Sequence, residues 1–225
     1  MLKRILIITL VALVTTLTAM ASEKDDAINR VHHADQVFNE IMDAPDQGIP
    51  AGLLDKAQCI AIIPGQLKFA FIFGGNYGRG IATCRSGNKQ WSAPLFLAVS
   101  GGSIGYQIGG SSTDLVLLFM NQHALHSLLS DRFKLGADAS VAAGPVGRTA
   151  AADTDIKLNA EILSYSRAKG VFAGVSLQGA VVKSDDNANE AIYGASADRH
   201  TILSGATAVP DAAKSLLHSI VQFAG

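Results

Sequence analysis

The residue types that could support hydrolysis gather around Ser103, in the sequence Gly101-Gly102-Ser103-Ile104-Gly105. This segment matches G-x-S-x-G, the pattern of a nucleophile elbow in which a strand turns sharply into a helix. The next residues, 106–111, are glycine-rich and predict a strand. The candidate partners, Asp114 with His123 or His126, lie too close in the sequence for the usual layout. We therefore predict no catalytic residue and no enzyme, and a hydrolase built on Ser103 is our third hypothesis.

Two histidines, His123 and His126, stand three residues apart on a predicted helix and could reach one metal ion. A structural or catalytic zinc site needs a third protein ligand, and none is visible at a fitting spacing. The glycine-rich run 74–80 fits neither phosphate-loop pattern, and no helix is predicted to follow it. We predict no metal site and no cofactor.

The chain begins like an exported protein. Lys3 and Arg4 precede an apolar run, and Ala19-Met20-Ala21 has the small-x-small form of a signal-peptide cleavage site. The apolar run is shorter than the roughly 20 residues that a spanning helix needs. We expect residues 1–21 to be a signal peptide cleaved near Ala21, and the mature protein to be periplasmic or secreted in a bacterium.

The sequence does not decide whether the two cysteines, Cys59 and Cys84, form a disulfide. An oxidising compartment permits a disulfide between them. Two separate buried thiols are the alternative, because free cysteine is often buried like a small apolar residue.

Composition excludes nucleic acid as a partner. The chain has 18 basic and 19 acidic residues and a net charge of −1, whereas nucleic-acid-binding domains are usually strongly basic. Attraction to anionic membranes must therefore come from a local basic patch.

The order of the predicted elements defines the fold class. Helical spacing marks residues 23–43 and 210–223, and short strands with one mid-chain helix at 121–130 fill residues 59–183. Pro64-Gly65 is expected to end the first strand, residues 133–142 to form one strand, and Asp185 to Glu190 to form a polar loop. Consecutive strands without intervening helices favour antiparallel pairing, and glycine inside strands marks bends and bulges.

We therefore predict an α+β fold for a single domain, residues 22–225. Its core is a strongly curved, mostly antiparallel, barrel-like β-sheet, with an N-terminal helix, one mid-chain helix and a C-terminal helix. A two-layer sandwich is the alternative.

Five sequence blocks resemble the SYLF domain family. In order they are residues 73–80 (FGGNYGRG), 91–94 (WSAP), 102–109 (GSIGYQIG), 136–148 (GADASVAAGPVGR) and 164–177 (SYSRAKGVFAGVSL). The resemblance implies a lipid-binding or actin-binding domain. SYLF domains of eukaryotes are associated with phosphoinositide-rich membranes, partly through an amphipathic N-terminal helix, and with actin filaments; an exported bacterial member cannot meet cytosolic actin in its own cell.

Basic side chains inside these blocks or beside them are the candidate headgroup contacts: Arg148, with Arg132, Lys134, Arg167 and Lys169. Arginine suits phosphate because its planar fork donates two hydrogen bonds at once. The N-terminal helix is a poorer candidate, because residues 23–43 carry six acidic residues against two basic ones, and helices that lie on anionic membranes are usually basic.

Our first hypothesis is a non-enzymatic phospholipid-binding protein of the cell envelope that favours anionic, phosphoinositide-like headgroups. The second is an envelope protein-interaction or scaffold module that binds a protein partner and no lipid.

Overall fold

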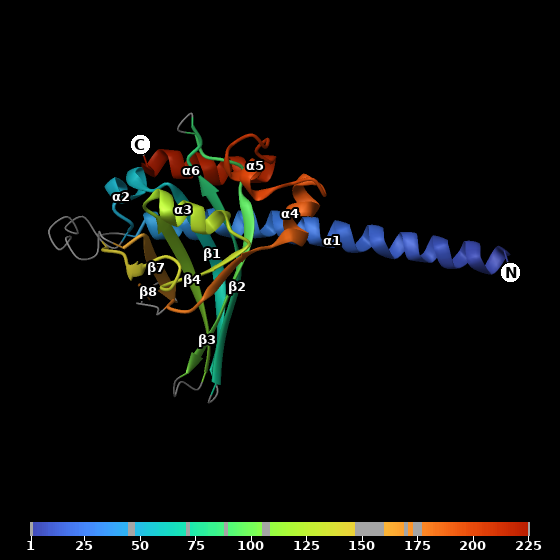
Figure 1. Cartoon of the computed structure of the whole chain (residues 1–225), viewed down its shortest axis with the longest axis horizontal. Coiled ribbons are helices and arrows are strands. Elements are labelled where there is room, and N and C mark those ends of the chain that lie inside the picture. The colour runs from blue at the N-terminus through green and yellow to red at the C-terminus, as the bar shows by residue number, and fades with distance from the viewer. Residues whose placement is uncertain are drawn as a thin grey trace.

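In the described part of the chain, nine strands form one curled sheet with helices packed against it (Figure 1). A computed structural model describes residues 2–44, 48–70, 73–87, 90–104, 109–146, 160–168, 171–172 and 177–224. The strand order is β5-β9-β3-β2-β1-β4-β7-β6, and β8 pairs with β7 outside this path. The sheet curls into a half-barrel, which confirms the predicted α+β class with a curved, mostly antiparallel sheet.

The element bounds show four long strands followed by short ones. The strands are β1 (Cys59–Ala70), β2 (Phe73–Cys84), β3 (Leu95–Ile104), β4 (Gly109–Phe119), β5 (Arg132–Lys134), β6 (Val141–Ala143), β7 (Ile162–Ala168), β8 (Val171–Phe172) and β9 (Val181–Ser184). The helices are α1 (Leu2–Met42), α2 (Ala51–Lys56), α3 (Gln122–Leu129), α4 (Asp186–Tyr193), α5 (Arg199–Leu203) and α6 (Lys214–Ala224), with a short 3₁₀ helix at Asp211–Ala213. The pairing of β6 with β7 is parallel, and the other ladders are antiparallel.

β1 is one long strand where the sequence predicts two. Its register shifts between Ile62 and Leu67, and Gly65 in that interval has a φ of 56°. The amide N–H of Gly65 donates to Oδ1 of Asp114 at 2.9 Å. A bulge accepts a residue with positive φ and does not need every N–H for the ladder. The Pro64-Gly65 pair therefore bends the strand, and the prediction that it ends the strand was wrong.

Both faces of the sheet are buried around residues 59–63 of β1 and 95–99 of β3. On one face, Ile60, Ile62 and Phe96 belong to a core shared with α1, α2 and α6. On the other, Ala61 and Leu97 belong to a core shared with α3 and α5. Burial on both sides explains why residues 59–63 are uninterruptedly apolar, because neither face of the strand meets water.

Helix α1 contributes a regular apolar stripe to the first core. Ala27, Val31, Ala34, Phe38 and Ile41, spaced four, three, four and three residues apart, are at most 2% exposed. The same helix continues in the N-terminal direction as far as Leu2 and projects beyond the sheet (Figure 1). It thus includes the segment expected to be a signal peptide, and cleavage near Ala21 stays a prediction.

Three further elements depart from the sequence-based prediction. The single strand expected at 133–142 is divided into β5 and β6, because the chain turns at Gly136 with a φ of 82°. The loop expected at Asp185 to Glu190 is mostly helix α4, and α5 is a short helix that the sequence does not predict. The C-terminal helix begins with the 3₁₀ turn after Pro210 and continues as α6.

Cys59 and Cys84 are joined by a disulfide between directly opposite positions of β1 and β2. Both residues are buried in the second core. Among the residues searched, which are those that the structure describes, no helix has the length and hydropathy needed to span a membrane.

Candidate headgroup-binding site

The edge formed by β5 and β9 carries three exposed cations. In β5, Arg132 and Lys134 are exposed while Phe133 between them is buried. In the neighbouring strand, Lys183 is exposed while Val182 is buried. Side chains of a strand alternate between its two faces, so the three cations share one face. We call Arg132, Lys134 and Lys183 the basic edge.

The pairing register places two of these cations side by side. Arg132 lies directly opposite Lys183 across the β5–β9 ladder, and the neighbour of Lys183 on its other side is Ala98 of β3. No ion pair reaches Arg132, Lys134 or Lys183 within the described residues.

The acidic side chains nearest to Arg132 and Lys134 in the sequence are engaged in other contacts. Asp131 pairs with Arg199 at 2.8 Å. Asp138 accepts the backbone N–H of Lys134 at 2.7 Å. The charged ends of the basic edge therefore face solvent without a carboxylate partner from either residue.

Apolar burial explains why this register holds although it opposes two like charges. Phe133 and Val182 are 3% and 2% exposed, and the Phe133 ring packs edge-on against Phe119 at 6.1 Å between centroids. Burying such side chains stabilises a fold by about 1.5–3 kcal/mol each, whereas a cross-strand pair of charges changes stability by roughly 0.2–1 kcal/mol. Burial of Phe133 and Val182 therefore determines the pairing register, and this register places Arg132 opposite Lys183.

The other predicted headgroup contacts do not join this edge. Arg167 is 18% exposed, lies on β7, and pairs with Glu40 of α1. This ion pair links the sheet to α1, so the guanidinium of Arg167 is poorly available to a membrane surface. Arg148 and Lys169 lie outside the described residues.

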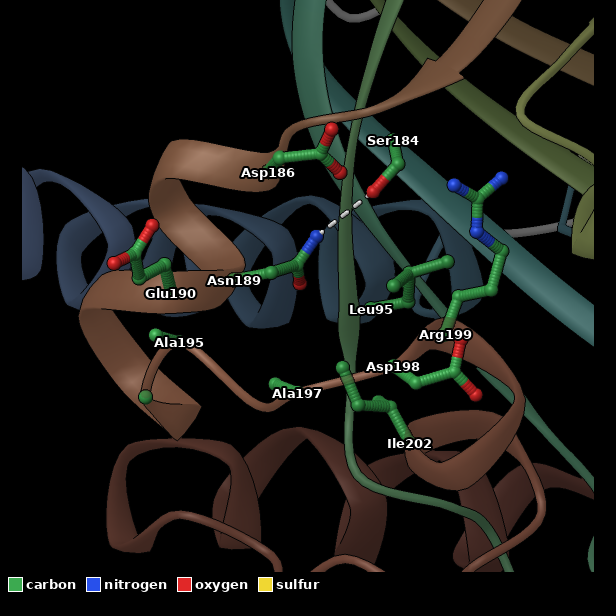
Figure 2. Close-up of a pocket in the computed structure, with 11 residues that line it drawn as sticks. Leu95, Ser184, Asp186, Asn189, Glu190, Ala195, Ala197, Asp198, Arg199 and Ile202 are labelled. Carbon is green, nitrogen blue, oxygen red and sulfur yellow. Dashed lines mark hydrogen bonds between the residues drawn. The ribbon is translucent and has the colours of Figure 1, made fainter.

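A pocket of about 320 Å³ lies between the start of β3 and helices α4 and α5 (Figure 2). Leu95 and Ile202 give it an apolar floor, and Asp186, Glu190 and Asp198 bring carboxylates to its wall.

Asn189 belongs to the wall of this pocket and is almost fully buried. Its side-chain oxygen accepts from the N–H of Phe96, and its amide nitrogen donates to the carbonyl of Phe96. The amide nitrogen also donates to Oγ of Ser184, as Figure 2 shows. Asn189 therefore ties α4 to β3 and β9 and has little capacity left for a ligand.

The charge of the pocket disfavours phosphate. Among the described residues that line it, Arg199 is the one cation, and it is bound to Asp131. Asp198 accepts the backbone N–H of Thr201 at the start of α5. The remaining carboxylates, Asp186 and Glu190, would repel an anionic headgroup. The pocket is thus predominantly acidic, whereas the basic edge is cationic.

A partly buried ion-pair network fastens α1 to the sheet on the same side as the basic edge. Oδ2 of Asp185 accepts from Arg30 at 2.8 Å and from Arg79 at 2.9 Å, and Arg79 also pairs with Glu23 at 2.5 Å. The Arg30 guanidinium stacks over the ring of Phe96 at 5.4 Å. Burial alone would raise the pKa of Asp185, but hydrogen bonds from Arg79 and Arg30 outweigh it and hold the pKa below its usual value.

The residues weighed for catalysis and metal binding lie in ordinary structural positions. Ser103 lies near the end of β3, and the next described element is strand β4, so its backbone lacks the strand-to-helix turn of a nucleophile elbow. Nδ1 of His123 lies 2.5 Å from Glu161, whose other oxygen accepts from Ser140. Among the described residues, no three potential ligands are grouped around a metal site.

Sequence reasoning missed Lys183 and the Asp185 network. Lys183 follows the apolar pair Val181-Val182, which marks it as the outward residue of a short strand, but its proximity to Arg132 depends on a pairing across 51 residues of chain. Asp185 stands in a polar run that has the composition of a loop.

A curled, mostly antiparallel half-barrel with a helix across one face defines the class of protein: an α+β domain, here with an exposed basic edge. The chain belongs to the Ysc84 family, whose model is described as "Las17-binding protein actin regulator" and matches residues 100–223. This membership confirms the resemblance to SYLF domains.

Several relatives match most of this chain. Protein YSC84 of Saccharomyces cerevisiae is 37% identical over 182 residues, which are 80% of this chain and 38% of the yeast protein. LAS seventeen-binding protein 3 of the same species is 36% identical over 181 residues, 79% of this chain and 39% of the relative. SH3 domain-containing YSC84-like protein 1 of Homo sapiens is 31% identical over 189 residues, 83% of this chain and 55% of the human protein. The chain thus spans about two fifths to just over half of these relatives.

Proposed function

We propose that this chain is a non-enzymatic phospholipid-binding module of the bacterial cell envelope that favours anionic headgroups. The observation that carries the proposal is the basic edge: three exposed cations, two of them directly opposite each other, with no ion-pair partner among the described residues. Such a cluster supplies the local attraction that a chain with a net charge of −1 lacks as a whole.

The acidic segment 23–42 of α1 supports placing the membrane contact on the sheet. Its apolar stripe is already buried against the sheet, so docking α1 into a bilayer would remove that stripe from the core. The exposed side of the helix includes Asp25 and Asp26, which anionic headgroups repel.

The location in the cell envelope rests on the N-terminal segment. Lys3 and Arg4, the following apolar run and the Ala19-Met20-Ala21 site have the form of a secretory signal. An exported domain would meet phospholipid surfaces of the envelope, and for this chain we propose lipid in place of the actin named in the family description.

A protein partner is the alternative, and the names of the relatives favour it. The family description and the second yeast relative both name binding to Las17, a protein. For this chain the corresponding proposal is an envelope scaffold module that binds a protein and no lipid. The pocket with Asp186 and Glu190 would suit a basic side chain of such a partner.

One preparation can separate the two functions. The mature protein is purified from the envelope fraction, and the lipids extracted from it are identified by mass spectrometry next to a mock purification. Enrichment of anionic phospholipid supports the lipid function. A stoichiometric protein partner in a lipid-free preparation would support the scaffold function and contradict the lipid one.

A further inference from the structure

The basic edge contains an arrangement that costs stability unless an anion is bound. Arg132 and Lys183 are directly opposite on adjacent strands, and like charges in that position repel each other. Neither has a carboxylate partner in the described part of the chain.

A third cation, Arg79, lies in the same row of residues across the sheet, and it has acidic partners. Along this row Arg132 faces Lys183, Lys183 faces Ala98, and Ala98 faces Arg79. Arg79 is bound by Asp185 and Glu23. The fold therefore supplies two acids to the arginine beneath α1 and none to the two cations at the exposed end of the same row.

We propose that Arg132 and Lys183 together hold one phosphate oxyanion, and that Lys134 contacts a second anionic oxygen beside it. This inference rests on the proposed lipid function and names the residues and the chemical group of that site. Opposed residues of neighbouring strands have Cβ atoms about 5 Å apart, so two long side chains can converge on one phosphate. The arginine offers a two-pronged hydrogen-bond donor and the lysine a compact charge.

Anion binding and the stability of the edge are then coupled. A phosphate between Arg132 and Lys183 turns a repulsive pair into two attractive contacts, and a ligand that binds the folded state stabilises it. Because Phe133 packs against Phe119 in the core, this stabilisation is expected to appear in the melting temperature of the domain.

The charge reversal Arg132→Glu tests the inference, because it moves stability and binding in opposite directions. It sets a carboxylate opposite Lys183, so the melting temperature in phosphate-free buffer should equal or exceed that of the unaltered protein. Binding to vesicles containing anionic phospholipid should fall at least tenfold. A purely structural arginine would give the reverse, a lower melting temperature with unchanged binding.

Two further variants complete the design. Lys183→Ala removes one cation without adding a charge, and it should weaken vesicle binding while leaving the fold intact. Lys56→Glu, at an exposed position of α2, makes the same change in net charge as Arg132→Glu away from the edge, and it should keep at least half of the binding.

Inorganic phosphate and vesicles distinguish the sources of the anion. At constant ionic strength, phosphate in place of chloride should raise the melting temperature of the unaltered protein and not that of Arg132→Glu. A response to phosphate and vesicles assigns the site to the phosphate group itself, and a response to vesicles alone assigns it to phosphate on a lipid surface.

Failure of the inference and failure of the function give different results. If the unaltered protein binds anionic vesicles and Arg132→Glu binds them equally, the proposed function stands and the edge pair is wrong. If the unaltered protein binds neither anionic vesicles nor phosphate, both are wrong. An unfolded Arg132→Glu protein would also overturn the inference, since the reversal should relieve repulsion.

Discussion

Replacing Asp185 by Asn should loosen the attachment of α1 to the sheet. The substitution keeps the shape of the side chain but removes the charge that two arginines share. Arg30 is 7% exposed and loses its ion-pair partner, while Arg79 is 33% exposed and keeps Glu23. Most of the lost stability therefore comes from Arg30, which is left as a buried cation beside a neutral amide.

The size of the effect follows from that burial. Breaking a buried ion pair by removing one partner costs about 3–5 kcal/mol, and we take the lower end because Asp185 is itself 12% exposed. About 3 kcal/mol in a domain of this size lowers the melting temperature by roughly 6–12 °C. Asp211→Asn is the matched control, because Asp211 pairs with Lys214 at an exposed site, and its loss should not measurably change the melting temperature.

The pH dependence gives the prediction a second test. The folded-state pKa of Asp185 is lowered, so its stabilisation is present above the ordinary carboxyl pKa of about 3.9 and is lost as the pH falls through the lower folded value. Thermal unfolding followed by circular dichroism should show the full difference between the unaltered and Asp185→Asn proteins at pH 7 and a smaller one near pH 2. Equal melting temperatures at pH 7, or a difference that does not shrink in acid, would refute the reasoning.

Three other predictions address the covalent and packing features of the chain. Denatured, non-reduced mature protein should contain no free thiol, and two free thiols would exclude the bridge. Reduction of the Cys59–Cys84 bridge, which links residues 25 positions apart, should lower the free energy of unfolding by roughly 3 kcal/mol. Gly144→Ala should destabilise by about 1–3 kcal/mol in urea unfolding, since the new Cβ would lie 2.2 Å from Cζ of Tyr165. Gly52→Ala, which meets nothing within 4 Å inside α2, should be neutral or stabilise by up to about 1 kcal/mol; equal losses in the two alanine variants would contradict the packing argument. The intact mass of protein from the envelope fraction should lack residues 1–21, and a mass that retains them would refute the signal-peptide prediction.

Elements with local patterns were predictable from the sequence. The stripe of α1 follows directly from the spacing of Ala27, Val31, Ala34, Phe38 and Ile41. The mid-chain helix α3 was also predictable, since Asn121 caps it by accepting the N–H of Ala124. In both cases the residues that decide the structure lie within a few positions of one another.

Helix α4 shows why other elements were not predictable. Its sequence, DNANEAIY, has the polar composition of a loop, and the residue that anchors it, Asn189, does so through bonds to Phe96, 93 residues away. Such bonds satisfy a buried amide only after the sheet has formed.

The candidate site depends on the same distinction. The sequence shows Arg132, Lys134 and Arg167 as equivalent cations, but Arg167 meets Glu40 of α1 across 127 residues and becomes a tie within the fold. Arg132 meets Lys183 and stays exposed. Residue type alone predicted which cations could contact a headgroup. The strand pairing determined which of them stay exposed and which pair within the fold.

Co-sedimentation of the unaltered mature protein with vesicles tests the central claim most directly. Two vesicle populations are compared, one of zwitterionic phospholipid alone and one containing anionic phospholipid, each at low and at high salt. We predict recovery with the anionic vesicles that declines as salt is added, because exposed charges are screened over about 8–10 Å near physiological ionic strength, and little recovery with the zwitterionic ones. Equal recovery on both vesicles, or recovery on neither, would contradict binding of anionic headgroups by the basic edge.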